Sequence, residues 1–147
     1  MTRLLADAGL SDRFVVDSAG TGDWHVGDEM DARARLTLDR HGYDVPPHVA
    51  KAFTAELFAE RDLVVAIDRG HLSRLGQLAR MADDPEQATA ALVLLRGFDP
   101  LAVADGELDV PDPYYGSPEG FEKVLDQIED ACDGLLADLQ QQIHRRQ

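Results

Sequence analysis

One short stretch, Asp112-Pro113-Tyr114-Tyr115-Gly116, combines residue types that could do chemistry. A carboxylic acid held on a loop beside aromatic side chains can protonate an oxygen that leaves during a reaction. The proline after Asp112 fixes the local backbone, and the two tyrosines could wall a pocket for a flat substrate. The alternative interpretation is an Asp-Pro turn with two partly buried tyrosines. Both interpretations place these residues on a loop.

A second stretch, residues 19–28, contains glycines but does not match a nucleotide-binding loop. Gly20, Gly22 and Gly27 do not follow Gly-x-Gly-x-x-Gly, because His25 occupies the position of the third glycine. No Gly-Lys-Ser or Gly-Lys-Thr is present either, so nucleotide binding is not expected. Trp24 in this stretch could line a pocket, or it could pack on the body of the protein.

The residue types that bind metals or act as nucleophiles are scattered. The histidines show no metal-ligand spacing; they are His25, His41, His48, His71 and His144. Cys132 is the only cysteine, and it falls on the apolar face of an expected helix, where buried, inert thiols are common. We therefore expect no metal site and no cofactor, and we interpret Cys132 as a core residue.

The composition predicts one globular, cytoplasmic domain over residues 1–147. A single cysteine gives no disulfide framework, which suits a reducing compartment. No apolar run is long enough to cross a bilayer, and no signal peptide opens the chain. The net charge of -14 repels nucleic acid and anionic membranes, so neither is an expected partner.

Apolar runs and helical patterns alternate along the chain. Short apolar runs predict strands buried on both faces, at Phe14–Ser18, Leu63–Ile67 and Leu92–Leu95. Helices are expected at Thr2–Ala8, Asp31–His41, Arg69–Met81 and from Pro118 to the end of the chain. The segment Asp99–Gly116 is expected to be a long loop. This alternation predicts an α/β fold of three layers, in which helices flank a small parallel sheet.

Four stretches together resemble the low-molecular-weight protein tyrosine phosphatases. They are Val16-Asp17-Ser18-Ala19-Gly20-Thr21-Gly22-Asp23-Trp24-His25-Val26-Gly27, His48-Val49-Ala50-Lys51, Gly97-Phe98-Asp99-Pro100 and Asp112-Pro113-Tyr114-Tyr115-Gly116. Their order and spacing agree with the family over nearly the whole chain. The resemblance implies the phosphatase fold and hydrolysis of phosphotyrosine in phosphorylated proteins through a cysteinyl-phosphate.

The resemblance also implies roles for individual residues. Asp112 would be the general acid, which protonates the leaving tyrosyl oxygen and later takes a proton from the attacking water. Tyr114 and Tyr115 would form an aromatic wall that grips the substrate ring. Trp24 would form the opposite wall and tune substrate preference.

The chain departs from the family at its beginning. The family's nucleophilic cysteine and its phosphate-binding arginine lie in a Cys-x-x-x-x-x-Arg-Ser loop after a first strand, and residues 1–147 contain neither. Ser18 and His48 match positions that hydrogen-bond to this loop, so here they would lack their partner. In the family the missing strand lies between the strands that match Phe14–Ser18 and Leu63–Ile67. We therefore expect an N-terminally incomplete domain, inactive by itself, whose sheet either closes directly or keeps a gap.

Several functional interpretations stay open at this point. A start upstream of Met1 would supply the missing loop, and the longer protein would be a phosphatase for phosphotyrosine or for phosphoarginine. The chain could instead be a non-catalytic remnant that acts as a binding module. An arsenate reductase on the same fold would need further redox cysteines, which Cys132 alone cannot supply. The retention of Asp112 together with the other site residues favours the first interpretation. These are Ser18, Trp24, His48, Tyr114 and Tyr115.

Overall fold

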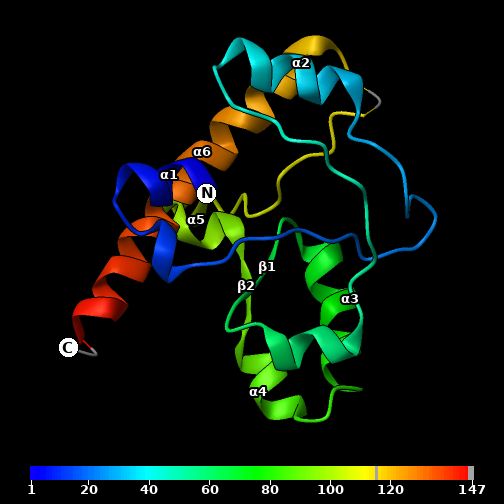
Figure 1. The fold of residues 1–147 in the computed structure, drawn as a ribbon, viewed down its shortest axis with the longest axis vertical. Helices are drawn as coiled ribbons and strands as arrows, with labels where there is room; N and C mark the ends of the chain where they lie inside the picture. Colours follow the sequence, from blue (N-terminus) through cyan, green and yellow to red (C-terminus); the bar gives the residue numbers. More distant parts are fainter. Residues whose placement is uncertain (115, 146–147) are drawn as a thin grey trace.

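The structure is a computed structural model that describes residues 1–114 and 116–145. In chain order, with η for 3-10 helices, the elements are α1 (Thr2–Asp7), η1 (Ser11–Arg13), α2 (Ala32–Arg40), η2 (Ala55–Glu60), β1 (Val64–Ala66), α3 (Arg69–Ala79), α4 (Pro85–Ala90), β2 (Leu92–Leu94), η3 (Leu95–Phe98), α5 (Pro100–Asp105) and α6 (Pro118–Arg145). Figure 1 shows the sheet between α3 and α4 on one side and α6 with α1 on the other.

The sheet consists of two short parallel strands within the described residues. Val64 pairs with Leu92, and Ala66 pairs with Leu94. Side chains of β1 alternate between the two helical layers: Val64 and Ala66 belong to the cluster with α3 and α4, whereas Val65 packs against the cluster with α6. This arrangement confirms the predicted three-layer α/β fold with a small parallel sheet.

The long helix α6 covers one face of the sheet, as its apolar periodicity predicted. Its buried positions include Phe121, Leu125, Cys132 and Leu135. Cys132 and Leu135 pack against Leu95 of η3, so the cysteine is a core residue as expected. The opposite face of α6 is polar, and neither α6 nor any other helix in residues 1–114 and 116–145 is long and apolar enough to span a bilayer.

Two short helices lie where the sequence analysis predicted none, and α5 falls within the segment expected to be a long loop. The helix α4 begins at Pro85, directly after Asp84, and α5 begins at Pro100, directly after Asp99. In both cases the aspartate side chain accepts hydrogen bonds from backbone N–H groups of the first helical turn. Aspartate at the N-cap followed by proline is a start signal that the prediction did not use. Within the described residues, the expected long loop is therefore limited to residues 106–114 and 116–117.

The predicted strand at Phe14–Ser18 is wrong, because this segment does not pair with the sheet of the described residues. Both of its valine side chains are open to solvent, with Val15 98% and Val16 47% exposed. The segment is held from the side by Asp17, whose carboxylate lies 2.6 Å from Lys51 Nζ and 2.8 Å from the Arg61 guanidinium. Of the two expected arrangements, direct closure of this segment onto β1 does not occur.

Candidate active site

The loop that carries Asp112 is attached to the carboxyl end of β1. The backbone N–H of Val110 donates to the carbonyl oxygen of Ile67, the residue after β1, at 2.9 Å. The neighbouring Asp109 contacts Arg69, the first residue of α3. Ligand sites of open α/β sheets lie at this end of the strands. The sequence motif is therefore placed at the edge where such a fold can build a site.

Asp112 itself is exposed and only lightly engaged. Its Oδ1 accepts a hydrogen bond from the backbone N–H of Tyr114 at 2.9 Å, which forms a local turn around Pro113. No cation lies within ion-pair distance of Asp112 among residues 1–114 and 116–145. The second carboxylate oxygen is thus available to an incoming group.

The neighbouring acid, Asp109, is in a different position. Its carboxylate accepts from the backbone N–H of Arg69 at 2.7 Å and from the Arg69 side chain at 3.2 Å. These donors, the backbone N–H first, hold the pKa of Asp109 below its usual range. A carboxylate fixed in this way is a poor proton donor, so Asp109 is not a candidate for the general acid.

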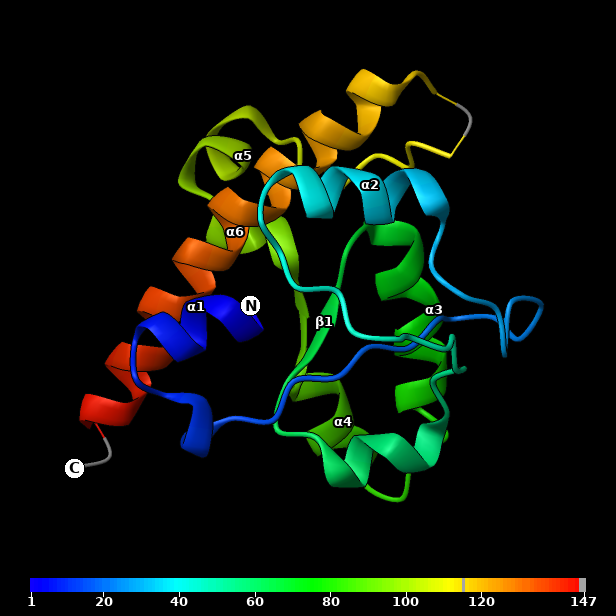
Figure 2. The same ribbon diagram turned by 45° about the horizontal axis from the view of Figure 1, so that its top comes forward.

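Tyr114 lies beside α2 and the start of α6. The guanidinium of Arg33 stands 5.3 Å from the centre of the Tyr114 ring and 4.9 Å from that of Phe121. Arg33 is fixed in turn by both carboxylate oxygens of Asp31, the N-cap of α2. Figure 2 shows α2 on the same side of the molecule as the loop after α5. Arg33 carried no sequence signal for this role, and Tyr115 lies outside the described residues.

Trp24 stands on the loop after the Phe14–Ser18 segment and is 68% exposed. Its ring covers Gly22 so closely that a Cβ on this glycine would lie 2.1 Å from the ring. On the other side the guanidinium of Arg74, from α3, lies 5.8 Å from the ring centre and 3.4 Å from the Thr21 hydroxyl. The tryptophan is therefore held against its own loop and α3 while much of its surface faces solvent, rather than being packed into the core.

Ser18 and His48 lie on two segments that run together. The backbone N–H of Gly20 donates to the Lys51 carbonyl at 2.7 Å, and that of Phe53 donates to the Gly20 carbonyl at 2.7 Å. Ser18 is exposed and His48 is half-buried. Neither side chain makes a hydrogen bond to another residue in the described part of the chain. Both can therefore accept a further partner.

Cys132 lies in the buried face of α6, outside these loops, and its thiol is not reactive. It is only 7% exposed, within the α6 core. Burial raises the pKa of its thiol, which disfavours the nucleophilic thiolate. Residues 1–147 contain no other cysteine.

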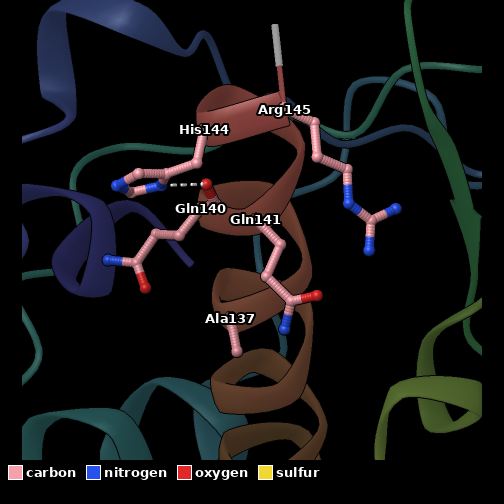
Figure 3. A pocket seen from close by; sticks show the side chains of 5 residues that line it. All are labelled: Ala137, Gln140, Gln141, His144 and Arg145. Atoms are coloured by element: carbon pink, nitrogen blue, oxygen red, sulfur yellow. Dashed lines mark hydrogen bonds between the residues drawn. The ribbon is translucent and has the colours of Figure 1, made fainter. Parts of the chain in front are cut away.

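A surface hollow lies elsewhere, near the C-terminal end of α6 (Figure 3). It is lined by Ala137, Gln140, Gln141, His144 and Arg145. Gln140 and His144 point to one side of the helix, and Gln141 and Arg145 point to the other. The imidazole Nδ1 of His144 is hydrogen-bonded to the Gln140 carbonyl oxygen at 2.7 Å. This hollow offers no convergent set of reactive groups.

Comparison with known proteins identifies the family to which these loops belong. The family model described as low molecular weight phosphotyrosine protein phosphatase matches residues 1–145. The chain belongs to the low molecular weight phosphotyrosine protein phosphatase family. A low molecular weight protein-tyrosine-phosphatase of Streptomyces coelicolor is 49% identical over 141 residues, which are 95% of this chain and 82% of the relative. The low molecular weight protein-tyrosine phosphatase A of Mycobacterium tuberculosis is 44% identical, over 89% of this chain and 74% of the relative.

A solved structure supports the same assignment. The protein tyrosine phosphatase of Entamoeba histolytica superposes with a TM-score of 0.85 at 28% identity, covering 95% of this chain and 84% of that protein. The chain therefore shares the fold of this phosphatase family as well as its sequence pattern.

Proposed function

We propose that this chain provides the general acid and the substrate walls of a protein tyrosine phosphatase, with Asp112 as the acid. The observation that supports Asp112 is its contrast with Asp109. Both acids lie on the same loop, but Asp109 is committed to Arg69, whereas Asp112 has no cation partner among the described residues. An acid that must give up and regain a proton during each turnover needs this freedom.

In the proposed reaction a cysteine thiolate attacks phosphorus while the bond between phosphorus and the tyrosyl oxygen breaks. Asp112 gives its proton to the leaving oxygen, and the phenol departs. The Asp112 carboxylate then takes a proton from a water molecule that attacks the cysteinyl-phosphate, which releases phosphate and restores the thiolate. By family resemblance the thiolate comes from a Cys-x-x-x-x-x-Arg-Ser loop, which residues 1–147 lack. Ser18 and His48 are proposed to hydrogen-bond to that loop.

The proposed substrate is phosphotyrosine in a protein. Trp24 and Tyr114 would face the two sides of the phenol ring, and Tyr115 would extend the wall on the Tyr114 side. Both Trp24 and Tyr114 are more than half exposed, so their rings can take up a further aromatic group. The names of the relatives favour phosphotyrosine over phosphoarginine.

The acid assignment can be tested in a chimera that joins the first strand and Cys-x-x-x-x-x-Arg-Ser loop of a family member ahead of Met1. Asp112→Asn should slow hydrolysis of aryl phosphates with poor leaving groups by about a hundredfold. It should slow p-nitrophenyl phosphate much less, because that leaving group needs little protonation. Asp105→Asn is the matched control, since Asp105 is an exposed acid at the end of α5. Equal slowing of all leaving groups would assign Asp112 a structural role.

The missing nucleophile can be tested separately on residues 1–147 alone. This polypeptide should leave p-nitrophenyl phosphate intact, because its one thiol is buried. Turnover above the blank that survives in a Cys132→Ser variant would reveal another nucleophile and would overturn the proposed chemistry.

A further inference from the structure

A buried arginine stands behind the loop that carries Asp112. Arg96 belongs to η3, directly after β2, and is only 7% exposed. Its Nη1 donates to the backbone carbonyl of Asp109 at 3.2 Å, and its Nη2 lies 3.6 Å from the carboxylate of Asp99. Its Nε is buried without a hydrogen-bond partner among the described residues. A buried guanidinium left partly unbonded adds little stability. Its hydrogen bond to the loop therefore points to a role other than stability.

Two consecutive residues of the loop are gripped from three elements at once. The Asp109 carbonyl accepts from Arg96 of η3, and the Asp109 carboxylate accepts from Arg69 of α3. The next residue, Val110, is 5% exposed, and its N–H donates to Ile67 at the end of β1. The loop is therefore fixed at residues 109–110 by charge-assisted bonds as well as by burial.

Asp112 follows this anchor after a single residue, Pro111, and is itself followed by Pro113. Proline fixes φ, so little backbone freedom separates Val110 from Asp112. We propose that the Arg96–Asp109–Arg69 latch is a positioning device, which sets the place of the Asp112 carboxylate against the leaving oxygen. This inference rests on the proposed function of Asp112. Arg96 acts through the loop and touches no reacting atom.

The latch can be tested in the same chimera with Arg96→Met, which keeps the length of the side chain but removes its donors. The rate for poor leaving groups should fall about tenfold, the effect of losing a charge-assisted hydrogen bond. KM, and the rate for p-nitrophenyl phosphate, should change little. Asp105→Asn serves again as the control with an unperturbed loop anchor.

A double-mutant cycle separates positioning from a general structural role. If Arg96 acts through Asp112, Arg96→Met should add no further loss in an Asp112→Asn background. A full additional loss there, or equal slowing of all leaving groups by Arg96→Met, would overturn the latch. If Asp112→Asn itself showed no dependence on the leaving group, the proposed function would fail instead.

A second variant guards against misfolding of Arg96→Met. Asp109→Asn keeps an acceptor for the Arg69 N–H but removes the charge that Arg69 contacts. In residues 1–147 it should speed hydrogen exchange at the Val110 amide while exchange in α6 stays unchanged. Unchanged exchange at Val110 in both variants would show that the loop is held without the latch.

Discussion

Replacing Gly134 by alanine should destabilise the protein, although alanine is the better helix former. Gly134 lies in α6 where this helix crosses η3. An added Cβ would lie 1.9 Å from the carbonyl oxygen of Phe98 and 2.8 Å from its carbonyl carbon. These are backbone atoms, which cannot rotate away as a flexible side chain can. The helix and η3 would have to separate by about 1 Å to reach even a tight contact of 3.0 Å.

The cost of that separation follows from what lies between the two elements. Leu95, Ala131, Cys132 and Leu135 form the buried cluster, and Phe98 packs against it. Overpacking a close-packed core costs about 1–3 kcal/mol. Alanine recovers about 0.5–1 kcal/mol over glycine in a helix interior. Because the clash is with main chain, we expect the upper part of the cost, and a net loss of about 2 kcal/mol in the free energy of unfolding.

Gly76→Ala in α3 is the matched control, because a Cβ at this position meets nothing within 4 Å. It should raise the free energy of unfolding by about 0.5–1 kcal/mol. The two variants can be compared by urea denaturation followed by circular dichroism. A Gly134→Ala protein as stable as Gly76→Ala would refute the reasoning, since it would mean that α6 and η3 do not approach each other this closely.

Acid stability should depend on Asp17, because hydrogen bonds from Arg61 and then Lys51 lower its pKa from 3.8 to about 2. The stability that Asp17 contributes is present above about pH 4 and is lost as the pH falls towards 2. In urea titrations, Asp17→Asn should therefore lose less unfolding free energy across this window than the unaltered protein. An equal loss in both would contradict the pairing. Cys132 should react with a disulfide reagent far more slowly in the native protein than in urea, since its thiol is buried and its pKa is raised; equal rates would show an accessible thiol. In the chimera, Trp24→Ala should raise KM for aryl phosphates more than for small alkyl phosphates, because stacking contributes about 0.5–1.5 kcal/mol; equal effects on both would point to packing.

The elements with strong local signals could be predicted from the sequence. The apolar face of α6 was visible because its buried residues recur with the helical period. The strand β1 was visible as a continuous apolar run, which is typical of strands covered on both faces. The short helices α4 and α5 were missed, since six residues show no periodicity and only their Asp-Pro starts announce them.

The candidate site divides in the same way. The Asp112 loop and Trp24 were proposed from two separate stretches, because each stretch groups residue types that could line a site. The arginines that support them were not found. Arg33, Arg69 and Arg96 come from three separate elements and meet the site only after folding. Nothing in their local sequence distinguishes them from the other arginines of the chain.

The Phe14–Ser18 segment is apolar but does not form a strand. Its apolar run is real, yet Val15 is almost fully exposed and the segment pairs with neither strand. Along β1, backbone groups point in turn to the two edges of the strand. The Val64 N–H donates to the Ala91 carbonyl, on the side of β2, so the N–H and C=O of Val65 point to the edge away from β2. An apolar sequence specifies that a strand can be buried there, but burial requires a neighbour with the matching edge. That requirement is non-local, so the composition of residues 14–18 could predict a strand without determining whether one forms.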